Sequence, residues 1–316
     1  MRLIKPFGIS RGTKTSAEVI QTSITRDGVT GFGEAVPYSR YGQTTAASIA
    51  QISSLPAEFN RQDLLGLLPA GAARNALDAA LWDLESKEAG VPVWKLAGFQ
   101  RPVPQAMGYT VSLRDIAEMT SDAKEHANVS LIKVKLGGSD DAKVVAEIRQ
   151  AAPNARLIVD VNEGWDISLF EKMIPVLVAA QVELVEQPLP SNQDDQLARL
   201  ACPIPLCADE SFQPGAELES LDQSYSFVNI KLDKSGGLTN ALADLNAARA
   251  RGLGVMVGCM VSSSLAIAPA FLLAQQADYS DLDGFLSIAN DHENPTRVQD
   301  GFLNPPEELW GYPASS

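Results

Sequence analysis

The sequence predicts an α/β protein, with a (β/α)8-type barrel and a smaller α+β capping domain. Two observations lead to this prediction. After Pro102, short apolar runs alternate with helix-patterned stretches at a spacing of about 25 residues, the length of one strand plus one helix. Before that point, strand and helix patterns follow one another without such a repeat.

The repeat contains eight apolar runs. They read QAMGYTV, LIKVKL, RLIVDVN, ELVEQPL, PLCADE, FVNIKLD, GVMVGCM and YSDLDGF, and helical stretches such as DDAKVVAEIRQAAP separate them. Eight strand-helix units are the number that closes a barrel. A doubly wound sheet is the rival architecture, but it usually needs fewer strands and often begins with a glycine fingerprint that is absent here.

The first hundred residues have a different pattern. AEVIQTSITRDGVTGFGEAV places β-branched residues on both sides of an Asp27-Gly28 turn, which predicts a hairpin. Residues Ala46 to Phe59 and Gly71 to Ala89 have helical spacing. We therefore expect residues 1–100 to form the capping domain, completed by the C-terminal segment 291–316, and residues 101–290 to form the barrel.

Composition excludes several classes of partner. The chain has 316 residues and a formal net charge of −14, which disfavours nucleic acid and anionic membrane surfaces as partners. No apolar run reaches the ~18 to 20 residues that cross a bilayer. The three cysteines form no C-x-x-C pair, and Pro6 and Gly8 interrupt any signal-peptide core. We expect a reduced, cytoplasmic protein.

Polar residues gather at the ends of the predicted strands, where barrel active sites lie. These residues are Lys133 and Lys135 in the second run, Asp160 and Asn162 in the third, Glu186 in the fourth, Asp209 and Glu210 in the fifth, Asn229, Lys231 and Asp233 in the sixth, and Asp281 and Asp283 in the eighth. An unpaired buried charge costs several kcal/mol, so a purely structural core would not place charges at so many matching positions.

Three of these carboxylates come from successive strands and predict a metal site. Asp160, Glu186 and Asp209 would line one arc of the barrel mouth, where their mutual repulsion is relieved by a hard divalent cation. The sequence has only two histidines, so oxygen ligands dominate, and these suit Mg²⁺ or Mn²⁺.

The lysines predict proton transfer next to that cation. Lys135 and Lys231 end strands that lie four apart in a ring of eight, so they would face each other across the mouth. Removing a proton α to a carboxylate produces an enediolate, which a divalent ion stabilises. A lysine base needs a pKa lowered towards ~7 to 8, and we expect burial, the metal and the neighbouring Lys133 to lower it.

The set of motifs resembles the muconate-lactonizing subgroup of the enolase superfamily, whose members use Mg²⁺ with a Lys or His base. The matching motifs are K-x-K (Lys133, Lys135), DVN (Asp160), VEQP (Glu186), ADES (Asp209) and NIKLDKSGG (Lys231), in order along nearly the whole chain. The resemblance implies a TIM-like barrel of the modified (β/α)7β type. It implies one Mg²⁺ per subunit on Asp160, Glu186 and Asp209, with Lys135 and Lys231 as the two acid/bases.

Within the subgroup, RYGQ, PAGAARNALDAALWDL, EQPLP, GCM and DLDG are similar to L-Ala-D/L-Glu epimerases, the dipeptide epimerases of murein peptide recycling. That similarity implies inversion of the Glu α-carbon by two-base proton transfer. It implies that Lys133 helps to hold the substrate carboxylate and that Asp281 and Asp283 bind the dipeptide's ammonium group. A mobile cap loop, here SRGTKTSAE, would cover the site, with Arg11 and then Lys14 as candidates to bind the Glu side chain.

One departure and several alternatives stay open. The family has a further strand before the stretch that here begins KPFGIS, and this sequence shows none there. The same site could serve a cycloisomerase or an o-succinylbenzoate-synthase-like dehydrating enzyme. A lysine Schiff-base enzyme and a non-catalytic binding barrel are further alternatives. The sequence does not determine whether the chain forms a homo-oligomer.

Overall fold

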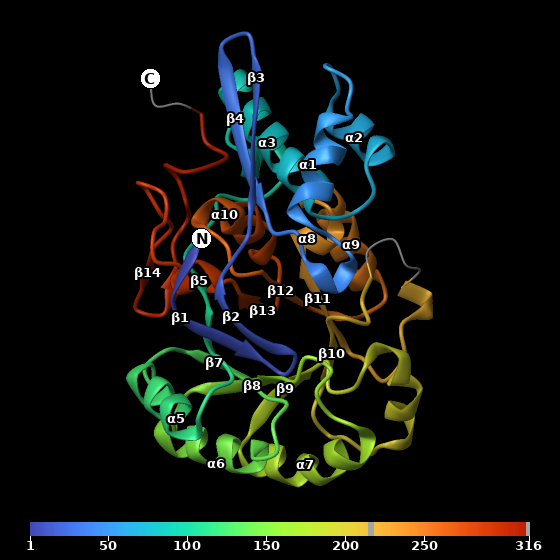
Figure 1. Cartoon of the computed structure of the whole chain (residues 1–316), viewed down its shortest axis with the longest axis vertical. Coiled ribbons are helices and arrows are strands. Elements are labelled where there is room, and N and C mark those ends of the chain that lie inside the picture. Colours follow the sequence, from blue (N-terminus) through green and yellow to red (C-terminus); the bar gives the residue numbers. More distant parts are fainter. Residues whose placement is uncertain (214–217, 314–316) are drawn as a thin grey trace.

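Eight parallel strands form one sheet in chain order in the computed structural model, which describes residues 1–213 and 218–313 (Figure 1). The strands are β6 (Gly108–Val111), β7 (Leu131–Lys135), β8 (Arg156–Asp160), β9 (Val182–Glu186), β10 (Leu206–Ala208), β11 (Phe227–Lys231), β12 (Gly254–Gly258) and β13 (Tyr279–Asp281). Each coincides with one of the eight predicted runs, with β9 beginning one residue before its run, so the barrel prediction is confirmed.

Side-chain contacts join the first barrel strand to the last. The backbone N–H of Thr110 in β6 donates to Asp283 Oδ2 at 2.6 Å, just beyond β13. The Thr110 hydroxyl donates to Asp281 Oδ1 at 3.4 Å. The barrel is therefore nearly closed, and this junction lies at the strand ends where function was predicted.

Helices follow most of the barrel strands and cover their outer face. They are α5 (Ile116–Glu125), α6 (Asp141–Ala151), α7 (Ile167–Ala179), α8 (Leu232–Ser235), α9 (Leu238–Ala250) and α10 (Ser264–Ala274). Only 3-10 turns follow β9, β10 and β13 among the described residues: η2 (Ser191–Arg199), η3 (Leu218–Ser220) and η4 (Gly284–Ser287). The last strand thus lacks a long helix, as in a (β/α)7β barrel.

Strand β7 shows how the sequence produces both the core and the site. All five of its residues are buried. Ile132 and Val134 pack outward with Val145 of α6, whereas Leu131 belongs to an apolar layer inside the barrel. Because side chains two apart share a face of a strand, Lys133 and Lys135 also point into the barrel, above Leu131.

The cap consists of two hairpins and a group of helices (Figure 1). Its elements are β1 (Arg2–Ile9), β2 (Gly12–Ser16), β3 (Ile20–Arg26), β4 (Val29–Ala35), η1 (Ser39–Tyr41), α1 (Thr45–Ser53), α2 (Arg61–Leu67), α3 (Ala72–Ala89) and α4 (Val93–Leu96). The predicted turn at Asp27-Gly28 joins β3 to β4. The predicted helix from Ala46 to Phe59 is wrong beyond Ser53, because Pro56 disfavours helical backbone in the residue before it.

The segment expected to be a mobile loop has regular structure. Residues 12–16 form β2, which pairs with β1 and leaves only Ser10 and Arg11 in the turn. The residues before KPFGIS belong to β1 itself, which begins at Arg2. The turn is therefore held at the end of a two-stranded hairpin.

Helix α3 attaches the cap to the loop after β11. Arg74 donates to the carbonyl oxygens of Ser235, at 2.7 Å, and Gly236, at 3.1 Å. Asn75 donates to Asp233 Oδ1 at 3.0 Å, and this carboxylate also accepts the backbone N–H of Val36. The segment that follows Lys231 is thus bonded directly to the cap.

The C-terminal segment contacts both parts of the chain. Strand β14 (Val298–Gln299) pairs with β15 (Phe302–Leu303), and β15 pairs with β5 (Gln105–Ala106). The Trp310 indole donates to the carbonyl of Ala79 in α3 at 3.0 Å. The assignment of residues 291–316 to the cap, like the domain limits, stays a prediction. Among the described helices, none has the length and apolar character to cross a membrane.

We predict that Gly33→Ala destabilises the fold. A Cβ at Gly33 in β4 would lie 2.1 Å from the carbonyl oxygen of Ala76 in α3, so the hairpin would have to move off the helix. Such overpacking costs about 1–3 kcal/mol or more. The control is Gly66→Ala in α2, where a Cβ meets no atom within 4 Å. We expect it to be neutral or to stabilise by roughly 0.5–1 kcal/mol. Urea unfolding measures both, and equal stabilities would contradict the prediction.

Candidate active site

A cavity of about 720 Å³ lies between the cap and the C-terminal ends of the barrel strands. Most of the predicted site residues line it: Arg11 and Lys14 from the cap, and Lys135, Asp209, Lys231, Asp281 and Asp283 from the barrel. Lys133, Asp160 and Glu186 lie beneath this lining and are 0% exposed. The structure thus brings all ten residues to one end of the barrel.

The three predicted metal ligands occupy neighbouring strand ends. Asp160 ends β8 directly opposite Glu186, which ends β9, and Asp209 follows β10. All are buried. Parallel strands end at the same edge of the sheet, which explains why residues so distant in sequence meet here.

Lysine ammonium groups lie among these carboxylates. Lys133 Nζ is 2.6 Å from both Glu186 Oε2 and Asp281 Oδ2, and 3.0 Å from Asp160 Oδ2. Lys135 Nζ donates to Asp160 Oδ2 at 2.5 Å. Both buried lysines of the K-x-K motif are therefore paired with carboxylates, as buried charges must be.

Asp209 has two lysine partners. Lys231 Nζ donates to Oδ2 at 2.7 Å, and Lys234 Nζ donates to Oδ1 at 2.7 Å. Lys234 also donates to the carbonyl oxygens of Asp209 and Phe212. Asp209 is consequently held on both oxygens, by Lys231 at the end of β11 and by Lys234 in α8.

These contacts shift the pKa values of the cluster in opposite directions. Burial alone would raise the pKa of Asp160 and Asp209, but the adjacent ammonium groups hold both well below the usual range. Burial and the charge of Asp160 raise the pKa of Glu186 to about 8. One carboxyl of the cluster is thus poised to carry a proton near neutral pH.

The lysines depart from the sequence-based expectation. Burial lowers the pKa of Lys133 and of Lys231, but the surrounding carboxylates outweigh it and raise both well above the usual value. For Lys231 this is opposite to the lowering expected of a lysine base, because the sequence argument counted the neighbouring cations and not the anions.

The donor set suits a hard divalent cation. Three buried carboxylates supply oxygen ligands alone, and among the described residues Glu186 Oε2 has only its ion pair with Lys133. The three carboxylates are more widely spaced than a group at Asp122, Glu125 and His126, whose ligand atoms lie within 4.8 Å of one another. Among the described residues that outer group alone meets this spacing, but its Glu125 is exposed and its His126 is half-buried, whereas all three strand-end carboxylates are buried. The chemistry of the strand-end carboxylates therefore fits Mg²⁺ better.

Asp281 and Asp283 are held by the barrel itself. Asp281 pairs with Lys133, and Asp283 accepts the Thr110 backbone N–H. Burial and the charge of Asp281 raise the pKa of Asp283 to about 7. Both carboxylates line the cavity, so a cationic ligand group there would meet at least one negative charge.

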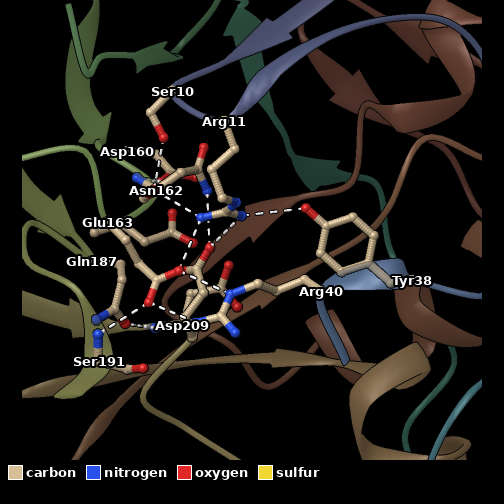
Figure 2. Close-up of polar contacts among 12 residues, drawn as sticks. Ser10, Arg11, Tyr38, Arg40, Asp160, Asn162, Glu163, Gln187, Ser191 and Asp209 are labelled. Atoms are coloured by element: carbon tan, nitrogen blue, oxygen red, sulfur yellow. Dashed lines mark hydrogen bonds and ion pairs between the residues drawn. The ribbon is translucent and has the colours of Figure 1, made fainter. Parts of the chain in front are cut away.

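The cap contributes Arg11 directly above the strand ends (Figure 2). Its guanidinium donates to the Asn162 carbonyl at 2.8 Å, to Glu163 Oε2 at 3.2 Å and to Glu210 Oε1 at 2.7 Å. Lys14 lies farther out, with Nζ 5.0 Å from the centre of the Tyr38 ring. Arg11 is the better placed of the two to meet a ligand carboxylate.

The sequence reasoning missed several residues of this site. Lys234 follows Lys231 by three positions, and its role becomes clear only when α8 folds its ammonium onto Asp209. Arg40, in the quoted RYGQ motif, makes a two-point ion pair with Glu163. Asn229 donates to Glu186 Oε1 at 2.7 Å. Asn229 was itself named among the polar strand-end residues, and only its contact with Glu186 was missed.

Comparison with known families gives two matches. A family model described as "Mandelate racemase / muconate lactonizing enzyme, N-terminal domain" matches residues 1–98. A second, described as "Enolase C-terminal domain-like", matches residues 115–311. Together they span most of the chain.

Two characterised relatives are similar over nearly their whole length. The chain is 42% identical over 288 residues to an N-acetyl-D-glutamate racemase of a Pseudoalteromonas species, and the alignment covers 89% of this chain and 91% of the relative. It is 39% identical over 305 residues to the L-Ala-D/L-Glu epimerase of Escherichia coli K12, and the alignment covers 95% of both chains.

Two solved structures share the fold. An enolase family member from Agrobacterium tumefaciens, with bound sodium and L-Ala-L-Glu, aligns with a TM-score of 0.93 at 41% identity over 98% of this chain and 97% of its own. A dipeptide epimerase from Cytophaga hutchinsonii, complexed with Mg and D-Ala-L-Val, aligns with a TM-score of 0.89 at 28% identity over 98% and 91%.

We predict that Lys234→Gln destabilises the protein when EDTA is present. The substitution leaves Asp209 buried with one cationic partner fewer, and removing one member of a buried ion pair costs about 3–5 kcal/mol. The matched control is Lys143→Gln, at an exposed position of α6, with an expected change within about 0.5 kcal/mol. Thermal unfolding measures both variants, and equal melting temperatures would contradict the assignment of Lys234.

Proposed function

The chain belongs to the enolase superfamily and is an isomerase, and we propose that it epimerises the Glu α-carbon of L-Ala-D/L-Glu dipeptides. One observation carries the proposal: Lys135 and Lys231 approach a single cavity from strands β7 and β11, four apart in the sheet. The relatives named dipeptide epimerases support it. We also propose a role in murein peptide recycling; the cytoplasmic location and the oligomeric state stay predictions.

The two lysines would act as the two acid/base groups. One, as a neutral amine, would take the α-proton, and the other, as an ammonium, would donate a proton to the opposite face of the same carbon. The configuration would thus invert through an enediolate. Each ammonium already rests on an aspartate, Lys135 on Asp160 and Lys231 on Asp209, which fixes the position from which it reaches the cavity.

Asp160, Glu186 and Asp209 would hold one Mg²⁺, with Mn²⁺ as a substitute. The support is their burial, their oxygen-only donor set and the magnesium of the solved Cytophaga relative. When bound there, Mg²⁺ would supply the positive charge that stabilises the enediolate. Lys133, buried among the same carboxylates, would add to that positive field and help to hold the substrate carboxylate.

The two ends of the dipeptide would be recognised by opposite charges. Asp281 and Asp283 would bind the α-ammonium group of the alanine residue, and Arg11 would bind the Glu side-chain carboxylate, with Lys14 as a second cation. The A. tumefaciens relative contains L-Ala-L-Glu, a ligand with both of these groups.

A second candidate is racemisation of an N-acylated glutamate. It needs the same lysines but no ammonium subsite. Asp281 is already paired with Lys133, and Asp283 accepts two hydrogen bonds from Thr110, so neither carboxylate is without a partner. The similarity to the N-acetyl-D-glutamate racemase adds to this candidate.

We predict that the Glu α-proton of both dipeptides exchanges with solvent. ¹H NMR in D₂O with Mg²⁺ should show L-Ala-L-Glu and L-Ala-D-Glu each losing the α-proton signal as they interconvert. EDTA and Lys231→Ala should each abolish the reaction. Exchange of N-acetylglutamate alone would favour the second candidate. Activity unchanged in Lys231→Ala would rule out the two-base mechanism, and an inactive wild type would redirect the search to cycloisomerase or dehydration substrates.

The second prediction concerns pH. Since Asp283 has a pKa of about 7, raised by burial and by Asp281, it gains a proton as the pH falls through neutrality and loses attraction for an ammonium group. The kcat/KM for L-Ala-L-Glu should fall roughly tenfold from pH 8 to pH 6 through this group. Asp283→Asn should lack this step, and N-acetylglutamate should not show it. A step of the same size in the variant would contradict the assignment.

A further inference from the structure

We propose that Glu163 is a positioning residue that clamps two separate cap segments to the barrel, and that this clamp sets the preference for a side-chain carboxylate on the substrate. The inference rests on the proposed function, because it concerns the orientation of Arg11. Glu163 lies in the loop after β8, does not line the cavity among the described residues, and acts through its neighbours.

Both oxygens of the Glu163 carboxylate accept two hydrogen bonds. Arg40 donates from Nη2 to Oε1 at 2.9 Å and from Nε to Oε2 at 3.0 Å. The backbone N–H of Ser191 donates to Oε1 at 3.0 Å, and Arg11 Nη1 donates to Oε2 at 3.2 Å. One carboxylate therefore joins the β1–β2 turn, η1, the loop after β8 and the loop after β9 (Figure 2).

The backbone at this point is held in an unusual conformation. Asn162 and Glu163 have φ values of 47° and 66°, in the left-handed region that non-glycine residues seldom adopt. The Glu163 N–H donates to the carbonyl of Gln187 at 2.9 Å, and Ser10 Oγ and Arg11 both donate to the carbonyl of Asn162. Cap and barrel together thus support a costly conformation, which is typical of functional loops.

The clamp also fixes which edge of Arg11 faces the cavity. Nη1 is taken by Glu163 and by the carbonyl of Asn162. Nη2 lies on the other side, 3.3 Å from the Tyr38 hydroxyl and 2.7 Å from Glu210 Oε1, and both of these residues line the cavity. Because its partners line the cavity, the Nη2 edge is the one that a substrate carboxylate would meet, in exchange for the contact with Tyr38 or Glu210.

Charge balance explains why an anion is needed here. Arg11 and Arg40 come from different cap segments, and their guanidinium groups would repel each other without the carboxylate between them. Burial would raise the pKa of Glu163, but hydrogen bonds from Arg40 and Ser191 lower it overall. The carboxylate thus stays ionised and holds both cations.

The test is Glu163→Gln, which keeps the size of the side chain and removes its charge. The kcat/KM values for L-Ala-L-Glu and L-Ala-L-Gln are measured with Mg²⁺. Loss of Arg11 orientation should lower the ratio of acid to amide substrate at least tenfold, mainly through KM for the acid. A merely structural contact would lower both values and leave the ratio unchanged. An unchanged or increased ratio overturns the proposal, since removing an anion near Arg11 by itself favours the acid substrate.

Glu183→Gln is the matched control. Glu183 in β9 makes the same kind of two-point ion pair with Arg156, from Nε to Oε1 at 3.0 Å and from Nη2 to Oε2 at 2.7 Å, but at the opposite end of the strands from the cavity. Its substitution should leave the substrate ratio unchanged. A fall in the ratio equal to that of Glu163→Gln would overturn the assignment to Glu163.

A second readout does not depend on turnover. Hydrogen exchange of residues 8–16, followed by mass spectrometry, should be at least tenfold faster in Glu163→Gln than in the wild type and Glu183→Gln. Unchanged exchange overturns the clamp. If the wild type epimerises neither dipeptide, the proposed function fails while exchange still decides the clamp. Should Glu163→Gln fail to fold, Arg40→Gln removes the two-point ion pair and is measured in the same way.

Discussion

The structure depends on the compensation of charge inside the mouth of the barrel. Each buried ion costs several kcal/mol when it has no partner, and here lysines at the ends of β7 and β11 flank the carboxylates at the ends of β8, β9 and β10. Lys133 compensates Asp160, Glu186 and Asp281, and Lys231 and Lys234 compensate Asp209. A shift of one residue in any of these strands would turn its charge into the apolar layer under the helices. The strand register that keeps the barrel core apolar is therefore also the register that places the charged residues of the site.

Much of this arrangement could be predicted from the sequence, because it follows from the repeat of strand plus helix and from the alternation of side chains along a strand. The repeat of strand plus helix predicted the barrel, and the alternation along LIKVK predicted that Lys133 and Lys135 share the inner face. The carboxylates at successive strand ends then had to meet, since parallel strands finish at one edge. The β3–β4 hairpin was equally local, because its turn residues are adjacent in the chain.

The rest could not be predicted because it depends on contacts between distant segments. Arg40 and Glu163 are separated by 123 positions, and Arg11 and Glu210 by 199. No glycine marks the left-handed backbone at Asn162 and Glu163, and at Glu163 it is held by its surroundings and not by local preference. The raised pKa of Lys231 also required knowing which carboxylates lie beside it. The spacing of residues in the sequence predicted the candidate site residues, but the direction of each pKa shift depends on the three-dimensional structure.

The hydrogen bonds from α3 to the segment after β11 limit how the cap can be exchanged between related proteins. Arg74 and Asn75 are buried, and their partners are backbone carbonyls and a carboxylate of the barrel. If the cap detached, a guanidinium, an amide and the Asp233 carboxylate would all lose their partners at once. Cap and barrel should therefore unfold in one cooperative step. A chimera that exchanges the cap between relatives would have to carry the residues of this seam with it, so new substrate preferences are reached more readily by altering single loops than by exchanging the whole cap.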